Sequence, residues 1–595
     1  MTKNIFSTPR AKAHLQRNAF DLSRRDVFSC KAGQLLPVVT IECNPNEHFE
    51  IRPDIFLRTA TLNTCAYARM KQKIEFFFVP YRSLWFKSDQ FFTGTNYSTS
   101  SVYSDKAPLQ VPRFPLSPKD PSQPSNTFLA WISKMVAGSG FPNQFGADAL
   151  EDYLKLLDML GYGCYQKPTT GDASLYDATA TTNVGNYASL LRLAAYQKIY
   201  QDHYRLPLYE SYNNGCSLDD LQKHFEASSN GIVYTDFSGG SIAGLTTGTD
   251  RFFQLQYAPW KKDYFTNLRA SSQLYLSRWM YTEAGGSNYA DFGQLANIAF
   301  DVQGYHAANE TGSVVEPMSL SALNVRALFA LEKLLDNMAR AKDGSYNAQV
   351  EARFGVKPLL DPHLDSFYIG GADAPVVIGE VTATAAGSAT VGGDSVQSAL
   401  GQVSGKGTSS SSNRTITFDT KEHGIIMGIF SIIPESEYNA TGIDPMLQKF
   451  SRPEFFTPEF DKLGFAPVML REMFAGSSVN VSNPYPEEVD WDTTVLGFNP
   501  MYSEYKTALD KVHGDFISTT ANHTGALSAW VTPRLFDEVY AKGTGLTYVF
   551  LHVNPAILDT IFAVHADTAD QFYVNCWNDI RAIRPMSVNG LPYCN

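Results

Sequence analysis

Few residues in this sequence are spaced as a catalytic or metal site would require. Asp490 and Asp492 flank Trp491, and two carboxylates this close could hold a metal ion or act as an acid–base pair. Aspartates are also common in turns, where their side chains bond to the local backbone, and we favour that interpretation. Glu422 and His423 stand directly before an apolar run, so a solvated or hydrogen-bonded pair at the start of a strand is the simpler interpretation.

The stretch 401–408, GQVSGKGT, superficially resembles a phosphate-binding loop but lacks two of its required residues. Leu400 stands where the first glycine is needed, and Gly407 follows Lys406 where a Ser or Thr is needed. The sequence also contains no HExxH zinc motif, no GxSxG elbow and no calcium-hand spacing. We therefore predict a protein that is not an enzyme, with no catalytic residues, no metal ligands and no cofactor.

Basic side chains near the N-terminus are the remaining candidates for a binding site. Against the single acid Asp21, the first 25 residues contain Lys3, Arg10, Lys12, Arg17, Arg24 and Arg25. An arm of this composition can contact the phosphates of nucleic acid or a partner protein, and it can equally be a solvated terminus. The net charge of the chain is −12, so any contact with nucleic acid must be local or mediated by a separate basic partner.

Composition favours a soluble protein rich in β-structure. Hydrophobic residues make up 44% of the chain and charged residues 18%, so a large core is available, and the 39 Phe and 31 Tyr suit pleated sheets. The seven cysteines are odd in number, widely spaced and without a CxxC pair, so we expect reduced thiols rather than disulfides or a zinc site. We expect no membrane insertion, because no apolar run is long enough to span a bilayer.

The clearest single element is a strand over Arg69–Tyr81, RMKQKIEFFFVPY. In its first half, apolar or neutral side chains alternate with charged ones, as they do when successive side chains point to opposite faces of a sheet. From Phe76 onward both faces are apolar, and Pro80 ends the pattern because it cannot donate to a sheet ladder. We predict a strand that begins half-solvated and ends buried on both faces inside a large β-sandwich.

The other elements follow the same reasoning. Further strands are predicted over 35–41, 49–57, 424–433, 546–553 and 571–583, and helices over 147–160, 187–204 and 320–340. Two segments lack such periodicity: an irregular, aromatic-rich segment over 205–320 and a Gly/Ser-rich flexible loop over 383–413. The chain is thus mainly β at both ends, as in a single eight-stranded antiparallel jelly roll with long loop and helical insertions. We expect a basic arm over 1–29 and one jelly-roll domain over 30–595.

Several stretches resemble, in order, the major capsid protein of the Microviridae, small icosahedral single-stranded DNA bacteriophages, and especially its gokushovirus-like branch. The similar stretches, which together span nearly the whole chain, are 20–23 (FDLS), 30–38 (CKAGQLLPV), 74–85 (IEFFFVPYRSLW), 257–267 (YAPWKKDYFTN), 353–356 (RFGV), 369–371 (IGG), 422–428 (EHGIIMG), 496–505 (LGFNPMYSEY) and 584–586 (RPM). No single stretch is specific, but the ordered set is.

The resemblance implies a structural virion protein with a jelly-roll fold, assembled in the cytoplasm of the bacterial host and located in the capsid. It implies self-assembly through pentamers into a T=1 icosahedral capsid around circular single-stranded DNA (ssDNA). The partners it implies are the chain itself, a small basic DNA-packing protein, a DNA pilot protein, the packaged ssDNA through local contacts, and a host surface that exterior loops could contact. An insertion between two strands would build a threefold protrusion, which we expect near 269–320.

One alternative of a different class stays open at this point. Exposed aromatic side chains and paired carboxylates also suit a carbohydrate-binding or carbohydrate-active β-sandwich protein. Uniform small icosahedral particles or pentamers would support the capsid interpretation, whereas a stable monomer under all assembly conditions would exclude it.

Overall fold

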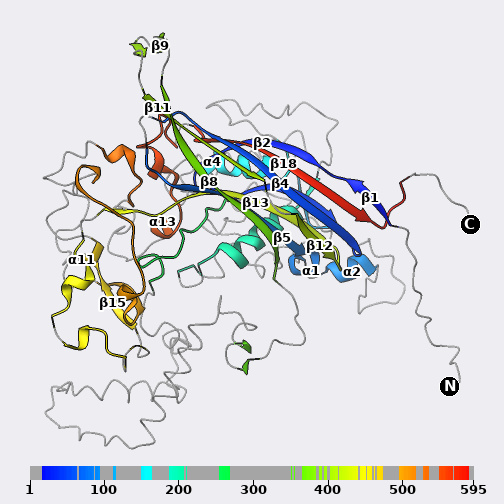
Figure 1. The fold of residues 1–595 in the computed structure, drawn as a ribbon. Coiled ribbons are helices and arrows are strands. Elements are labelled where there is room, and N and C mark those ends of the chain that lie inside the picture. Colours follow the sequence, from blue (N-terminus) through cyan, green and yellow to red (C-terminus); the bar gives the residue numbers. More distant parts are fainter. Residues whose placement is uncertain are drawn as a thin grey trace, which may run out of the picture.

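Figure 1 shows the computed structural model of the chain, in which strands dominate. The residues that it describes are 17–62, 66–85, 87–93, 111–115, 149–163, 187–206, 209–210, 254–268, 350–351, 354–355, 365–382, 387–391, 394–398, 403–412, 415–439, 442–450, 452–458, 461, 465–473, 495–517, 527–534, 548–566 and 569–588. None of their helices is long and apolar enough to cross a membrane.

The strands and helices have the following bounds. The strands are β1 (Asn18–Asp21), β2 (Arg24–Cys30), β3 (Leu36–Cys43), β4 (Glu47–Thr59), β5 (Met70–Pro80), β6 (Arg113–Pro115), β7 (Tyr187–Ser189), β8 (Phe367–Thr382), β9 (Gly387–Val391), β10 (Asp394–Ser398), β11 (Val403–Ser412), β12 (Ile416–Thr420), β13 (Gly424–Pro434), β14 (Tyr438–Asn439), β15 (Phe465–Met469), β16 (Val495–Pro500), β17 (Lys511–Val512) and β18 (Phe572–Arg584). The helices are α1 (Tyr81–Leu84), α2 (Ser88–Thr93), α4 (Ala149–Met159), α5 (Leu191–Ile199), the π-helix η2 (Tyr200–Tyr204), α11 (Leu470–Met473) and α13 (Tyr548–Leu551). Short 3-10 turns are η6 (Pro445–Gln448), η7 (Arg452–Glu454), η10 (Ser503–Tyr505), η11 (Gly514–Phe516), η12 (Ser528–Trp530) and η13 (Pro555–Leu558).

Ten of the described strands form one large, curled, antiparallel sheet. Eight of them follow the order β1-β18-β4-β11-β8-β5-β13-β3, with β2 also paired to β18 and β12 also paired to β4. Strand β8 joins the two halves, because residues 367–376 pair with β5 and residues 377–382 pair with β11. The sheet folds over so that Phe28 of β2 meets Phe430 of β13 with ring centroids 5.3 Å apart. This is the predicted mainly β architecture, a jelly roll carrying insertions.

Strand β5 is central to one half of this sheet, paired with β13 on one side and β8 on the other. Its burial follows the predicted pattern: Lys71 is exposed between buried neighbours, whereas Phe76, Phe77, Phe78 and Val79 are all buried. The two faces of the phenylalanine run have different neighbours. Phe78 contacts Phe418 of β12 inside the sandwich, while Phe77 packs against Tyr204 of η2 on the other face. The helical layer therefore explains why the alternation stops at Phe76.

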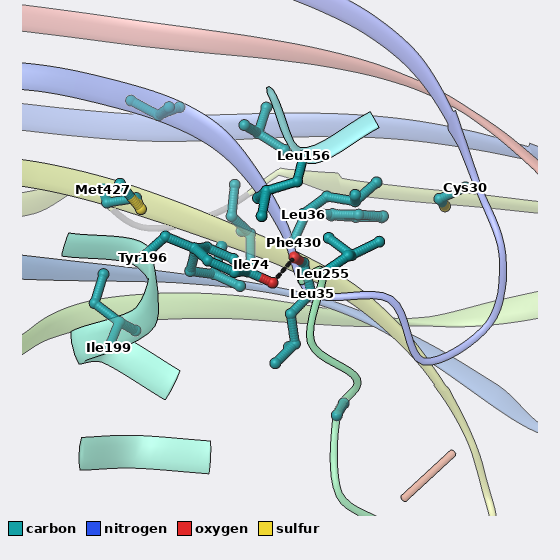
Figure 2. Close-up of a cluster of buried hydrophobic side chains, with 14 of the residues drawn as sticks. Cys30, Leu35, Leu36, Ile74, Leu156, Tyr196, Ile199, Leu255, Met427 and Phe430 are labelled. Atoms are coloured by element: carbon teal, nitrogen blue, oxygen red, sulfur yellow. Dashed lines mark hydrogen bonds between the residues drawn. The ribbon is translucent and has the colours of Figure 1, made fainter. Parts of the chain in front are cut away.

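Helix α5 supplies most of that outer layer over β5 and β13, and α4 packs against β3. Figure 2 shows Tyr196 and Ile199 of α5 beside Met427 of β13, with the Tyr196 hydroxyl pointing at Leu35, directly before β3. That hydroxyl donates to the Leu35 carbonyl oxygen (2.9 Å) and accepts from the Gln256 N–H (2.9 Å). A fully buried phenol needs such partners, because an unsatisfied hydroxyl in the core costs free energy.

A polar corner closes the turn from β3 into β4. Asn46 has a left-handed backbone (φ 66°), which Asn tolerates better than most residues. The Glu47 carboxylate is fully buried and accepts from the backbone N–H and the side-chain amide of Asn44, each at 3.0 Å. Arg584, at the end of β18, lies 3.5 Å from the same carboxylate and compensates its charge. The corner thereby joins the start of the sheet to its last strand.

Two of the predicted strands and helices differ from the structure. The predicted strand over 546–553 is wrong, because residues 548–551 form α13. Its buried Phe550 and Leu551 show that a short apolar run suits a buried helix as well as a strand. The helix predicted over 187–204 begins only at Leu191, since β7 pairs with β6 before it. The helix over 147–160 is confirmed as α4, and the one over 320–340 lies outside the described residues.

The segment 383–413, expected as a flexible Gly/Ser-rich loop, contributes strands to the structure. Strands β9 and β10 form a hairpin that projects at the top of Figure 1, and β11 lies between β8 and β4. Gly407 shows why small residues suit β11, because a Cβ there would lie only 2.6 Å from the Thr59 Cγ2. The Gly407 N–H instead donates to the Thr59 Oγ1 at 2.7 Å. Small side chains thus allow close packing here.

Candidate functional site

Several exposed apolar side chains lie close together in the sequence on one loop, residues 442–458, with Tyr505 beside it. Phe450 is 87% exposed and Leu447 is 72% exposed, and the others are Ile443, Met446, Phe455, Phe456 and Tyr505. We call this set the apolar loop surface. Single exposed apolar residues are normal on a protein, but a cluster of this kind is typical of a surface that another molecule covers.

The loop is held in place by polar contacts made beneath its apolar side chains. Asp444 caps the η6 turn by accepting from the Met446 N–H at 2.9 Å, and it accepts from the Lys511 ammonium at 2.9 Å. These two bonds favour the ionised carboxylate, so the pKa of Asp444 lies below its ordinary value. The bond to Lys511 also fastens the loop to strand β17.

A second anchor is the nearly buried ion pair between Lys449 and Glu504, whose side chains are 9% and 11% exposed. The same ammonium donates to the Glu454 carbonyl oxygen at 2.8 Å and lies 4.9 Å from the Tyr505 ring centroid. Breaking one partner of a buried pair is far costlier than breaking a surface pair, because the other charge stays desolvated. The loop therefore presents Phe450 to solvent from a fixed backbone.

A hollow of about 360 Å³ lies next to this surface. Its walls combine aromatic rings with carboxylates and are made by Tyr264, Phe265, Tyr438, Asn439, Gly442, Asp444, Pro445, Met446, Glu472, Met473, Glu504, Thr507, Ala508, Leu509 and Lys511. The Tyr264 hydroxyl donates to Glu472 at 2.8 Å, and burial raises the pKa of that carboxyl. The described residues contain no group of three or more His, Cys, Asp or Glu that could hold a metal ion.

The basic residues that the sequence predicted as one binding site do not all point to the same face in the structure. Lys3, Arg10 and Lys12 lie outside the described residues, and Arg17 is exposed directly before β1. Arg24 points inward from β2, where it donates to the Val38 carbonyl oxygen at 2.9 Å and contacts Asp26 at 3.2 Å. Arg25, the next residue, points to the opposite face of β2.

The charged face of β5 has partners within the chain. Arg69 contacts Asp510 at 2.5 Å and Glu435 at 3.2 Å, and Lys71 contacts Glu435 at 3.0 Å. Lys73 pairs with Glu75 at 2.8 Å on the same strand. These carboxylates neutralise much of the positive charge of this face.

The remaining sequence candidates for chemistry give no catalytic group. Asp490 and Asp492 lie outside the described residues. Lys406 lies in β11 rather than in a loop before a helix, so the stretch 401–408 does not have the backbone of a phosphate-binding loop. Glu422 pairs with Arg82 at 2.7 Å and the His423 ring stacks on Phe92 at 4.0 Å, as expected for polar residues at the start of a strand.

The comparisons with known proteins identify the class of molecule to which these surfaces belong. A family model described as "Capsid protein (F protein)" matches residues 10–123 and 166–594. The chain belongs to this capsid-protein family. Capsid protein VP1 of Chlamydia phage 1 is 24% identical over 660 aligned residues, which cover 99% of this chain and 97% of the relative. Capsid protein VP1 of Bdellovibrio phage phiMH2K is 24% identical over 171 residues, 29% of this chain and 28% of the relative.

The chain is therefore a Microviridae-type capsid protein, a structural component of the virion and not an enzyme. Because the capsid protein self-assembles, a neighbouring copy is sufficient to account for an apolar surface that a single copy leaves uncovered. Sequence reasoning missed the loop 442–458, since it has neither helical nor strand periodicity. The available signal was the presence of Phe450, Phe455 and Phe456 around Pro453, shortly after Met446 and Leu447.

Proposed function

We propose that this capsid protein assembles through pentamers into a T=1 icosahedral shell that encloses circular ssDNA. The observation that carries the proposal is the apolar loop surface, whose backbone is fixed by two anchors while Phe450 and Leu447 remain in solvent. A pre-organised surface loses little conformational entropy when it docks, so it favours a closed assembly of identical copies.

The net charge of the chain supports a role for a second, basic protein in packaging the DNA. With a net charge of −12, the subunit repels a polyanion at long range, so neutralising the genome requires a separate basic component. We assign that role to a small basic DNA-packing protein and expect a DNA pilot protein as a further partner. The arm over 1–29, including Lys3, Arg10 and Lys12, would add local contacts to the packaged ssDNA.

The insertion near 269–320 would build the threefold protrusion and provide loops that could contact the host. Support for this place comes from the residues on either side of it. Leu268 is fully buried in a second core with Tyr264 and Phe265, and the chain rejoins the sheet at β8, which starts at Phe367. An insertion between two anchored points can be exchanged without disturbing the sheet. Replacing 269–320 by a short linker should remove density from the outer surface of the particle while the shell remains.

The shell itself is tested by expressing the full chain with a circular ssDNA and the basic packing protein, then examining the product by electron microscopy. Uniform small icosahedral particles that protect the circle from nuclease are expected. Omitting the basic protein should reduce the protected DNA but leave pentamers. A protein that remains monomeric under all assembly conditions would refute the proposed function.

A further inference from the structure

The outward face of β2, β18 and β4 combines exposed aromatic rings with arginines. Along β18 every second side chain points outward, beginning with Tyr573, which is 50% exposed, and including Trp577, which is 47% exposed. Phe56 of β4 is 38% exposed and lies directly opposite Asn575, midway between the two. Diagonal neighbours on adjacent strands have Cα atoms about 7–8 Å apart, so the register places the three side chains near one another on one face.

Arginines surround these rings in the same strand register. Trp577 lies directly opposite Arg25 of β2, and Tyr573 lies directly opposite Arg58 of β4. The Arg25 guanidinium donates to the Asn575 side-chain oxygen at 2.7 Å, which holds it over this face. The Arg58 guanidinium carbon lies 5.2 Å from the Phe56 ring centroid, a cation–π arrangement.

Carboxylates and two more arginines lie on the same face: Asp54 of β4 is directly opposite Trp577, and Glu50 is directly opposite Arg581. Arg52 lies 3.9 Å from Asp54, and Arg581 lies 3.8 Å from Asp579. Pairs this long and exposed contribute little and are readily exchanged for other partners. Their carboxylates limit the attraction of the face for a polyanion, so affinity must come chiefly from stacking rather than from charge.

We propose that this face of β2, β18 and β4 binds single-stranded nucleic acid, in the particle the packaged ssDNA, by stacking bases on Phe56, Tyr573 and Trp577. Aromatic rings on an open sheet face, bordered by arginines that meet phosphates, are the recurring chemistry of single-strand recognition. Tyr573 and Trp577 are separated by about 13 Å along the strand, so they would hold different bases of one strand. A duplex, whose bases are already stacked, cannot use these rings.

The position of the N-terminal arm favours ssDNA over a second copy of the chain as the occupant. Strand β1 pairs with β18, so the chain that carries Arg17 and the basic residues before it enters at the edge of this same sheet. On the face itself Arg25, Arg52, Arg58 and Arg581 are largely balanced by Glu50, Asp54 and Asp579, so the added positive charge that favours ssDNA comes from the arm. The inference rests on the proposed DNA-filled capsid, but it concerns the soluble subunit and can be tested there.

The test measures fluorescence anisotropy of a labelled 20-nucleotide oligo(dT), and of a duplex of equal length, with the full chain kept as subunits or pentamers. Trp577→Ala and Tyr573→Ala should each weaken oligo(dT) binding about 5- to 100-fold, whereas Trp577→Phe should restore most of it. Arg58→Gln should reduce the slope of log K against log salt by about 0.7, as expected for one lost phosphate contact. Tyr368→Ala removes a similarly exposed aromatic (54%) from β8 in the other half of the sheet, so it is the matched control and should leave binding unchanged.

Three results would overturn the inference. The first is wild-type affinity for oligo(dT) in both alanine variants, and the second is equal binding of duplex and single strand. The third is loss of particle assembly in Trp577→Ala with ssDNA binding intact, which would make this face a contact between subunits. Failure of the wild-type chain to form particles would instead refute the proposed function, because binding to the soluble subunit is measured independently.

Discussion

Removing the two most exposed apolar side chains of the loop, Leu447 and Phe450, should disrupt assembly without disturbing the fold. Full burial of one such side chain contributes about 1.5–3 kcal/mol. Since Leu447 is 72% and Phe450 87% exposed in one subunit, most of that contribution is still available to a neighbour. The double change Leu447→Ala/Phe450→Ala should therefore cost about 2–5 kcal/mol per contact. At 1.4 kcal/mol per factor of ten, the association constant should fall roughly 30- to 3,000-fold.

The assay is sedimentation velocity over a range of subunit concentrations, with particles counted by electron microscopy. The concentration at which particles appear should rise, while the melting temperature of the subunit stays within the error of the wild type. Val588→Ala provides the control, because Val588 is also exposed (68%) but lies outside the loop. Unchanged assembly of the double variant would refute our assignment of this surface, and a lowered melting temperature would show that the loop side chains support the fold instead.

Two other predictions concern the sheet and the loop anchor. Gly428 faces Phe76 across β13 and β5, and a Cβ there would lie 2.8 Å from the Phe76 Cε1, so Gly428→Ala should destabilise the subunit by about 1–3 kcal/mol in thermal unfolding. Adding Phe76→Leu should recover part of this loss; a purely additive double variant would count against steric crowding as the cause. Asp444→Asn should accelerate hydrogen exchange of the Met446 amide at neutral pH. The folded pKa of Asp444 lies below the ordinary value of 3.8. The stabilisation that the ionised Asp444 carboxylate gives to the folded loop is therefore complete above pH 3.8 and is lost as the pH falls through the folded pKa. The difference between variant and wild type should therefore vanish in strong acid, and a difference that persists there would exclude the Lys511 ion pair as its source.

Burial was predictable where a single face of an element meets the core. The alternation in Arg69–Tyr81 gave the correct face for Lys71 and the correct end at Pro80, because the side-chain period of a strand is independent of its partners. Gly161 ends α4 with φ +86°, as glycine does at many helix ends. Reduced thiols were also expected, and Cys30, Cys43 and Cys576 are free and buried.

Prediction failed where the partner of a segment decides its conformation. The apolar stretch at 546–553 carries no periodicity, so only its packing in the second core distinguishes helix α13 from a strand. In β11 the small residues gave no side-chain pattern at all. Its strand conformation depends on backbone pairing with β4 and β8, which are distant in the sequence.

The sequence by itself determined the class of fold and the family, because strand periodicity is local and the similar stretches occur in a characteristic order. It also located a basic N-terminus without saying which of its arginines are available. Only the tertiary structure decided that Arg24 points inward while Arg25 lies beside Trp577, a residue 552 positions away in the chain. The same holds for Phe450, whose exposure depends on what the fold leaves uncovered. Both outcomes depend on strand register and packing between distant segments, which no local pattern specifies.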